Sequence, residues 1–195
     1  MKKEKVRDLF LCFLAYGFVG WMYEVLLGIF VFRVGFVNRG FMFGPYLPIY
    51  GFGALLFLIP LNKHKYKKSY IGKINMTPVY MFCAVVVLTT VIELITSYIM
   101  EYTIGEWLWD YDNYKYQFQG RIALNTSIRF GLGGLVILYG IHPVLDKLIT
   151  AINNRKMHMI TYGLAGVFFI DLVMRAFLGS NFKNSTTNYL VLVWN

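Results

Sequence analysis

The residues of this sequence most able to do chemistry are five ionisable side chains inside long hydrophobic segments: Glu24, Glu93, Arg129, Asp171 and Arg175. The first four fall at a similar depth, about eight residues from the same end of their segments, which is ~12 Å below one membrane surface at ~1.5 Å per helical residue. A charge inside a bilayer costs roughly 2.5–3.5 kcal/mol, so such residues usually face a bundle interior or a wet cavity. The pattern predicts one shared polar site near the outer leaflet.

These buried charges do not balance, because three are carboxylates and two are arginines. Asp171 and Arg175 are spaced i, i+4 and can form a structural pair on their own helix. Arg129 is expected to neutralise Glu24 or Glu93. One carboxylate is then left over, and it is either protonated through desolvation or paired from a loop.

Two loop arginines are the candidates for that pairing. Arg39 and Arg121 each stand at the outer end of a segment, beside a glycine that lets the backbone turn tightly. A guanidinium binds a carboxylate in a bidentate fork. We therefore expect at least one of them within salt-bridge reach of Glu24, Glu93 or Glu101.

A polar ladder lies on the third hydrophobic segment. Glu93, Ser97 and Glu101 follow one another at i, i+4 and i+8 along one helix face. An acidic ladder that rises to the surface suits a cation or proton path. The alternative is a structural glutamate held in a salt bridge, followed by an exposed glutamate at the helix end.

The start of the second hydrophobic segment, residues 38–53, is rich in glycine and proline. It runs from Asn38 and Arg39 through Gly44, Pro45 and Pro48. A broken helix frees backbone groups that can coordinate a substrate, provided that protein or water covers them. A simple proline-kinked helix start is the alternative, although kinking does not require Asn and Arg beside it.

The loop at residues 107–121 is dominated by aromatic residues and contains Asp110. Trp and Tyr favour the membrane interface, so an aromatic belt is one interpretation. The other is a rigid aromatic lid over the polar site, in which Trp109 and Tyr111 pack above the paired arginine.

Composition identifies the class of protein. Of the 195 residues, 57% are hydrophobic and 15% are charged, against about 25% charged in soluble domains. The apolar residues come in long runs, which predicts an all-α polytopic membrane helix bundle. The formal net charge of +9 comes from basic residues between these runs. It indicates membrane topology and anionic lipid, and we expect no nucleic-acid partner.

We predict a single transmembrane helical domain over residues 1–179 and a short extracytoplasmic tail, 180–195. Its five transmembrane helices are expected at residues 9–32, 43–61, 79–100, 122–144 and 159–178. Lys and Arg cluster in the loops on one side, which predicts a cytoplasmic N-terminus and an outside C-terminus. Small-residue stripes typical of helix contacts occur on the first and fourth helices: Gly17, Gly20 and Gly28, and Ser127, Gly131 and Gly134.

Several catalytic signatures are absent. The sequence has no Gly-x4-Gly-Lys-Ser/Thr phosphate loop, no His-Glu-x-x-His motif and no Gly-x-Ser-x-Gly elbow. His64, His142 and His158 are scattered, which argues against a zinc site. We expect no ATPase, zinc or serine-nucleophile chemistry in this chain, no cofactor and no bound metal.

Taken together, the motifs resemble the ABC-transporter type IV permease family of small bacterial integral membrane proteins. The resemblance covers residues 10 to 146 and implies a multi-pass protein of the bacterial cytoplasmic membrane. The residues that carry it are Gly17-Phe-Val-Gly-Trp21 with Glu24, Asn38 to Pro45 running into Pro48-Ile-Tyr-Gly51, Glu93 with Ser97 and Glu101, Trp109-Asp-Tyr111, Gly120-Arg121 and His142-Pro143.

These observations lead to one main hypothesis and two alternatives. The main hypothesis is a permease-like transport component with a polar site in the outer-leaflet half and an unknown substrate. Five helices are few for a lone transporter, so a homodimer or a separate ATP-binding subunit would complete it. The alternatives are a membrane enzyme acting on a lipid-linked or phosphate-containing headgroup, with arginines that grip phosphate, and an accessory subunit without chemistry.

Overall fold

Helices make up most of the computed structural model, which describes residues 2–31, 33–38, 42–105, 107, 109–152 and 154–191. The predicted all-α fold class is confirmed. Within the described residues, four helices are long and apolar enough to cross a membrane: Glu4–Val31, Thr77–Thr103, Leu124–Ala151 and Asn154–Phe177. The chain is therefore a multi-pass membrane protein, and the side on which each terminus lies stays a prediction.

The helix expected at residues 43–61 is shorter than predicted. Helix α2 runs only over Pro48–Leu61, 14 residues, or ~21 Å at ~1.5 Å per residue. The hydrocarbon core is about 30 Å thick, so α2 does not cross it unaided. The preceding residues are extended or bent, and their backbone groups are bound by other parts of the chain.

The chain divides into two compact units, and each is described by itself. The first contains residues 1–55 and 147–195. It holds α1 (Lys2–Leu26), the π-helix η1 (Leu27–Val31), the start of α2, and α6 (Asn154–Val191). Helix α6 continues past the predicted end of the fifth span at residue 178.

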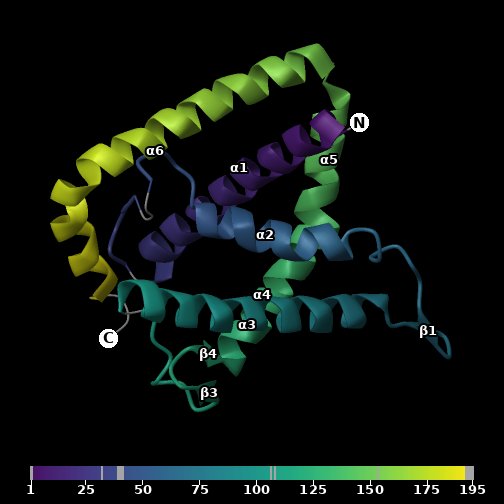
Figure 1. Ribbon diagram of the computed structural model, residues 1–195. Coiled ribbons are helices and arrows are strands. Elements are labelled where there is room, and N and C mark those ends of the chain that lie inside the picture. Colours follow the sequence, from purple (N-terminus) through teal and green to yellow (C-terminus); the bar gives the residue numbers. More distant parts are fainter. Residues whose placement is uncertain are drawn as a thin grey trace. The chain divides into compact units, whose positions relative to one another are not determined.

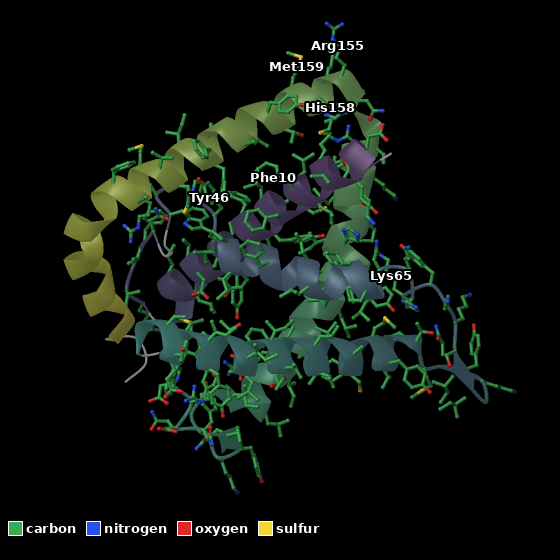
Figure 2. The ribbon with its side chains drawn as sticks, in the orientation of Figure 1. Phe10, Tyr46, Lys65, Arg155, His158 and Met159 are labelled. Carbon is green, nitrogen blue, oxygen red and sulfur yellow. The ribbon has the colours of Figure 1, made fainter. Side chains whose placement is uncertain are left out.

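In this first unit α1 packs against α6 through aromatic rings. The Phe168 ring of α6 lies edge-on to Phe10 and Phe13 of α1, with ring centroids 6.2 and 5.7 Å apart. Figure 2 shows Phe10 and Tyr46 in the space between these helices, and Tyr46 also contacts the Phe168 ring. Near the N-terminus, Arg7 of α1 donates to Asn154 Oδ1 at the start of α6 over 3.2 Å.

The predicted glycine stripe on α1 is a packing face. Gly17 O accepts a hydrogen bond from Leu47 N at 2.9 Å. A Cβ added at Gly20 would lie 2.1 Å from the Tyr50 ring. Glycine at these two positions therefore lets the segment before α2 approach the α1 backbone closely.

The second unit contains residues 56–146. Two short antiparallel hairpins flank the long helix α3, and one helical rod follows. The elements are β1 (Tyr70–Ile71), β2 (Ile74–Asn75), α3 (Thr77–Ile104), β3 (Gln117–Phe118), β4 (Ile122–Ala123), α4 (Leu124–Leu135), the π-helix η2 (Val136–Ile141) and α5 (His142–Ala151), whose last residues belong to the first unit. Figure 1 shows α4 crossing α3 close to the β3–β4 hairpin.

The small-residue stripe on α4 is a helix contact, as predicted, and its partner is α3. A Cβ on Gly131 would lie 2.5 Å from both Phe82 and Val86, and one on Gly134 would lie 2.5 Å from Val85. Thr90 Oγ1 on α3 donates to Ser127 Oγ on α4 at 2.8 Å. The contact is thus both close and polar, which suits helices that associate in lipid.

Adjacent glycines on α4 provide a matched test of this contact. Gly134→Ala is expected to destabilise the protein by ~1–3 kcal/mol, the usual cost of overpacking, because Val85 is fully buried and its rigid side chain blocks the new methyl group. Gly133→Ala meets nothing within 4 Å and should be neutral or slightly stabilising, since alanine favours helix by ~1 kcal/mol. Denaturant unfolding in detergent measures both, and equal midpoints would contradict the packing.

Candidate functional site

Three carboxylates that lie inside apolar segments each accept a hydrogen bond from a tyrosine hydroxyl. The three pairs are Tyr50 with Glu24, Tyr111 with Glu93, and Tyr46 with Asp171. The first two have oxygen–oxygen distances of 2.5 and 2.8 Å. These pairs form two clusters, one in each unit of the chain.

In the first unit, Asp171 holds the broken segment that precedes α2. Its Oδ1 accepts the backbone N–H of Phe43 at 3.0 Å and its Oδ2 accepts that of Gly44 at 2.8 Å. The Tyr46 hydroxyl donates to Oδ2 as well. The backbone groups that the missing helical turn leaves unbonded are therefore bound by a side chain of the protein itself.

Asn38 braces the same segment from its other end. Its Oδ1 accepts from Trp21 Nε1 at 2.6 Å, and its Nδ2 donates to Phe43 O at 2.9 Å. The Arg175 guanidinium carbon lies 5.6 Å from the centre of the Phe43 ring. Arg39, the neighbouring candidate, lies outside the described residues.

In the second unit, Arg121 is the centre of the polar cluster. Its Nη2 lies 2.5 Å from Glu101 Oε2, and its Nη1 donates to Ser97 Oγ at 3.3 Å. The guanidinium carbon lies 4.2 and 4.1 Å from the ring centres of Tyr98 and Trp107. The Arg121 side chain is only 7% exposed. The ion pair expected of one loop arginine is thus confirmed for Arg121, with Glu101.

The loop between α3 and α4 is fixed around this arginine. Trp109 Nε1 donates to Arg121 O at 2.7 Å, and Tyr111 N donates to Gly120 O at 2.9 Å. Gly120 has φ +65°, and a Cβ there would lie 2.7 Å from Asp112 Oδ1. Asp110 Oδ1 accepts a hydrogen bond from the backbone N–H of Asp112 at 2.9 Å and so closes a turn. Asp110 is thus part of the loop's internal bonding.

This loop positions the Tyr111 hydroxyl next to the Glu93 carboxylate. The Tyr111 side chain is 5% exposed, and burial, followed by the negative charge of Glu93, raises the pKa of its hydroxyl. The hydroxyl therefore keeps its proton and donates to Glu93 Oε1. The other oxygen, Oε2, is buried and has no hydrogen-bond partner among the described residues.

Some predicted contacts do not form. The predicted partner of Arg129 is Glu24 or Glu93. Arg129 lies on the exposed side of α4 and forms no ion pair with Glu93 in the described part of the chain, while the pairing with Glu24 stays a prediction. The ladder of Glu93, Ser97 and Glu101 is divided, because Arg121 binds its last two members. Glu24 and Asp171 belong to the other unit, and the single shared site stays a prediction.

The sequence reasoning missed Tyr46 and Tyr50 as carboxylate partners. Both stand in the glycine- and proline-rich segment at i, i+4 spacing, which was a usable signal. Their partners are on different helices, however, with Tyr46 directed to α6 and Tyr50 to α1. That choice depends on tertiary packing.

Removing one hydroxyl tests the tyrosine–carboxylate pairs. Tyr111→Phe is expected to cost ~1.5–3 kcal/mol of unfolding free energy, the usual range for a hydrogen bond to a charged group, because Glu93 then loses its only donor among the described residues. Tyr116→Phe is the control, since Tyr116 is 65% exposed; it should change stability by less than ~0.5 kcal/mol. Unfolding in detergent is the measurement, and two equal losses would refute the role of the pair.

Arg121 should not be replaceable by lysine. Arg121→Lys keeps the charge but loses the planar group that stacks between Tyr98 and Trp107 while bonding Ser97 and Glu101. We expect a lower unfolding temperature and faster proteolysis within residues 105–121. Arg129→Lys is the matched control and should leave both unchanged. Equal behaviour of the two variants would show that only charge matters at Arg121.

Comparison with known proteins gives one match. A protein-family model described as "Putative ABC-transporter type IV" matches residues 11–176, a range that includes both clusters. No curated protein and no solved structure matches the chain.

Proposed function

We propose, because the chain belongs to the putative ABC-transporter type IV family, that it is a permease-like component of a transporter in the bacterial cytoplasmic membrane. The energy for transport would come from ATP hydrolysis by a separate ATP-binding subunit, since the sequence carries no phosphate loop of its own. A second copy of the chain could complete the pathway. The cargo would be recognised in the membrane-embedded part.

The observation that carries this proposal is the state of Glu93. It lies within the candidate span Thr77–Thr103, where a charge is costly and usually marks an ion or substrate pathway. One oxygen is held by Tyr111, and the buried second oxygen has no partner in the described chain. A proton or a cationic group of the cargo would satisfy that oxygen.

The loop around Arg121 supports the same role. The ion pair with Glu101 and the stack between Tyr98 and Trp107 fix the loop that carries Tyr111. In this proposal Arg121 is a positioning residue, and Glu93 is the group that contacts the cargo. Opening of the Arg121–Glu101 pair would release Tyr111 and expose Glu93.

The first test concerns the assembly. The tagged chain, purified from its native membrane in mild detergent, is expected to carry an ATP-binding-cassette protein and measurable ATP hydrolysis. The proposed transport role would be overturned if the folded chain purified without a stoichiometric nucleotide-binding protein and the preparation showed no ATP hydrolysis.

The second test concerns Glu93. In a strain lacking the chromosomal gene, Glu93→Gln is expected to lower complementation of the deletion phenotype at least about tenfold, since the amide is uncharged and binds no proton at neutral pH. Asp112→Asn is the matched control, because Asp112 is an exposed loop residue, and it should complement fully. Membrane levels of both variants are compared by immunoblot. Full complementation by Glu93→Gln would exclude the proposed site.

A further inference from the structure

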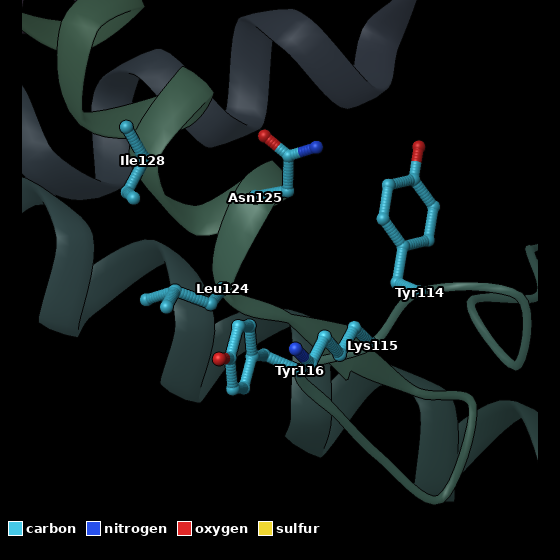
Figure 3. Close-up of a pocket in the computed structure, with 6 residues that line it drawn as sticks. All are labelled: Tyr114, Lys115, Tyr116, Leu124, Asn125 and Ile128. Carbon is cyan, nitrogen blue, oxygen red and sulfur yellow. The ribbon is translucent and has the colours of Figure 1, made fainter.

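An open groove lies where the β3–β4 hairpin segment meets the first turns of α4. Its volume is about 270 Å³, and its lining residues are Tyr114, Lys115, Tyr116, Leu124, Asn125 and Ile128. Figure 3 shows the side chains of residues 114–116 facing those of the first turns of α4. The proposed transport pathway around Glu93 does not use this groove.

The groove carries positive charge that no carboxylate of the described residues neutralises. The Lys115 ammonium lies 5.5 Å from the centre of the Tyr116 ring. Arg129 follows Asn125 by four residues, which places it on the same face of α4 one turn further along. In the described part of the chain, neither Lys115 nor Arg129 forms an ion pair with a carboxylate.

An apolar track continues from the groove along α4 to the first residue of η2. Leu124, Ile128, Leu132 and Val136 recur at every fourth position, and all four are exposed. At ~1.5 Å per residue this track is ~18 Å long, which is comparable to much of one lipid acyl chain. It begins where the candidate span Leu124–Ala151 begins, and the end of a membrane-crossing helix lies near the lipid headgroups.

A neighbouring side of α4 is already occupied. Ser127, Gly131 and Gly134 pack against α3. Helix contacts in membranes favour such small residues, whereas the exposed track consists of large aliphatic side chains. The track is therefore better suited to acyl chains than to another helix.

We propose that this face of α4 binds an anionic phospholipid, with its phosphate between Lys115 and Asn125. Arg129 lies below the headgroup level, and its long side chain extends upward to the phosphate oxygens, as basic residues near helix ends do. One acyl chain follows the track from Leu124 to Val136. The polar groove and the apolar track together fit a molecule that is anionic at one end and aliphatic along its length.

Binding is measured on the purified full-length protein in detergent by native mass spectrometry. Phosphatidylglycerol is expected to bind roughly tenfold more tightly than phosphatidylcholine, since each basic group near an anionic headgroup favours it. Equal affinity for the two lipids would overturn the proposal. Competition by sn-glycerol 3-phosphate as strong as that by phosphatidylglycerol would assign the groove to a soluble anion and would also overturn it.

Two double variants that remove the same charge distinguish a specific lipid-binding site from nonspecific electrostatic attraction of the lipid to the protein. Lys115→Gln with Arg129→Gln should weaken phosphatidylglycerol binding about tenfold or more, by the same reasoning. Lys68→Gln with Lys73→Gln removes two exposed charges near the β1–β2 hairpin and should leave the affinity unchanged. An equal loss of phosphatidylglycerol affinity in both double variants would show that only the net charge matters, and it would overturn the proposed site. Asn125→Trp keeps the charge and fills the groove, and it is also expected to abolish binding.

A measurement on the wild-type protein covers the case in which a variant does not fold. Phosphatidylglycerol with a photoreactive diazirine in its acyl chain is bound, irradiated and mapped by peptide mass spectrometry. The adducts are expected within residues 124–136. Adducts confined to other helices, or displaced equally by phosphatidylcholine, would refute the site.

Discussion

The structure depends on one constraint, which is that a carboxylate inside an apolar helix must have donors that do not come from water. Leaving a buried charged group without partners costs more than a lost neutral hydrogen bond. In this chain the donors are tyrosine hydroxyls, at Glu24, Glu93 and Asp171. Because each tyrosine lies far along the chain from its carboxylate, satisfying the carboxylate also fixes a loop or a broken helix start in place.

The same constraint explains why the irregular segments are ordered. The stretch before α2 lacks helical hydrogen bonds, and Asp171, Asn38 and Gly17 bind its backbone instead. The loop after α3 is held by Arg121, whose guanidinium satisfies Glu101 and Ser97 while its carbonyl accepts from Trp109. Non-helical backbone at membrane depth is tolerated only when protein covers it in this way.

Much of this was predictable from the sequence, and one error was avoidable. The helices, the Gly131–Gly134 contact and the Arg121–Glu101 pair follow from hydropathy, small-residue spacing and charge balance. Arg129 stands two residues from both Ser127 and Gly131, and two residues turn a helix by ~200°. The stripe faces α3, which carries Glu93, so Arg129 faces away from Glu93 and cannot pair with it. The partners of Tyr46 and Tyr50 were not predictable in this way, because they depend on how α1 and α6 approach α2.

The number of donors at each carboxylate separates structural from functional candidates. Asp171 accepts hydrogen bonds from two backbone N–H groups and a hydroxyl, and moving it would break the hydrogen bonds that hold the segment before α2. Glu93 receives one hydroxyl, and its second oxygen is buried without a partner in the described chain. A group selected only for stability would gain from a second donor there, since an unsatisfied buried oxygen lowers stability. An oxygen kept open at that cost is what a membrane protein needs in order to accept a proton or a cation, and for this reason the proposed transport role rests on Glu93.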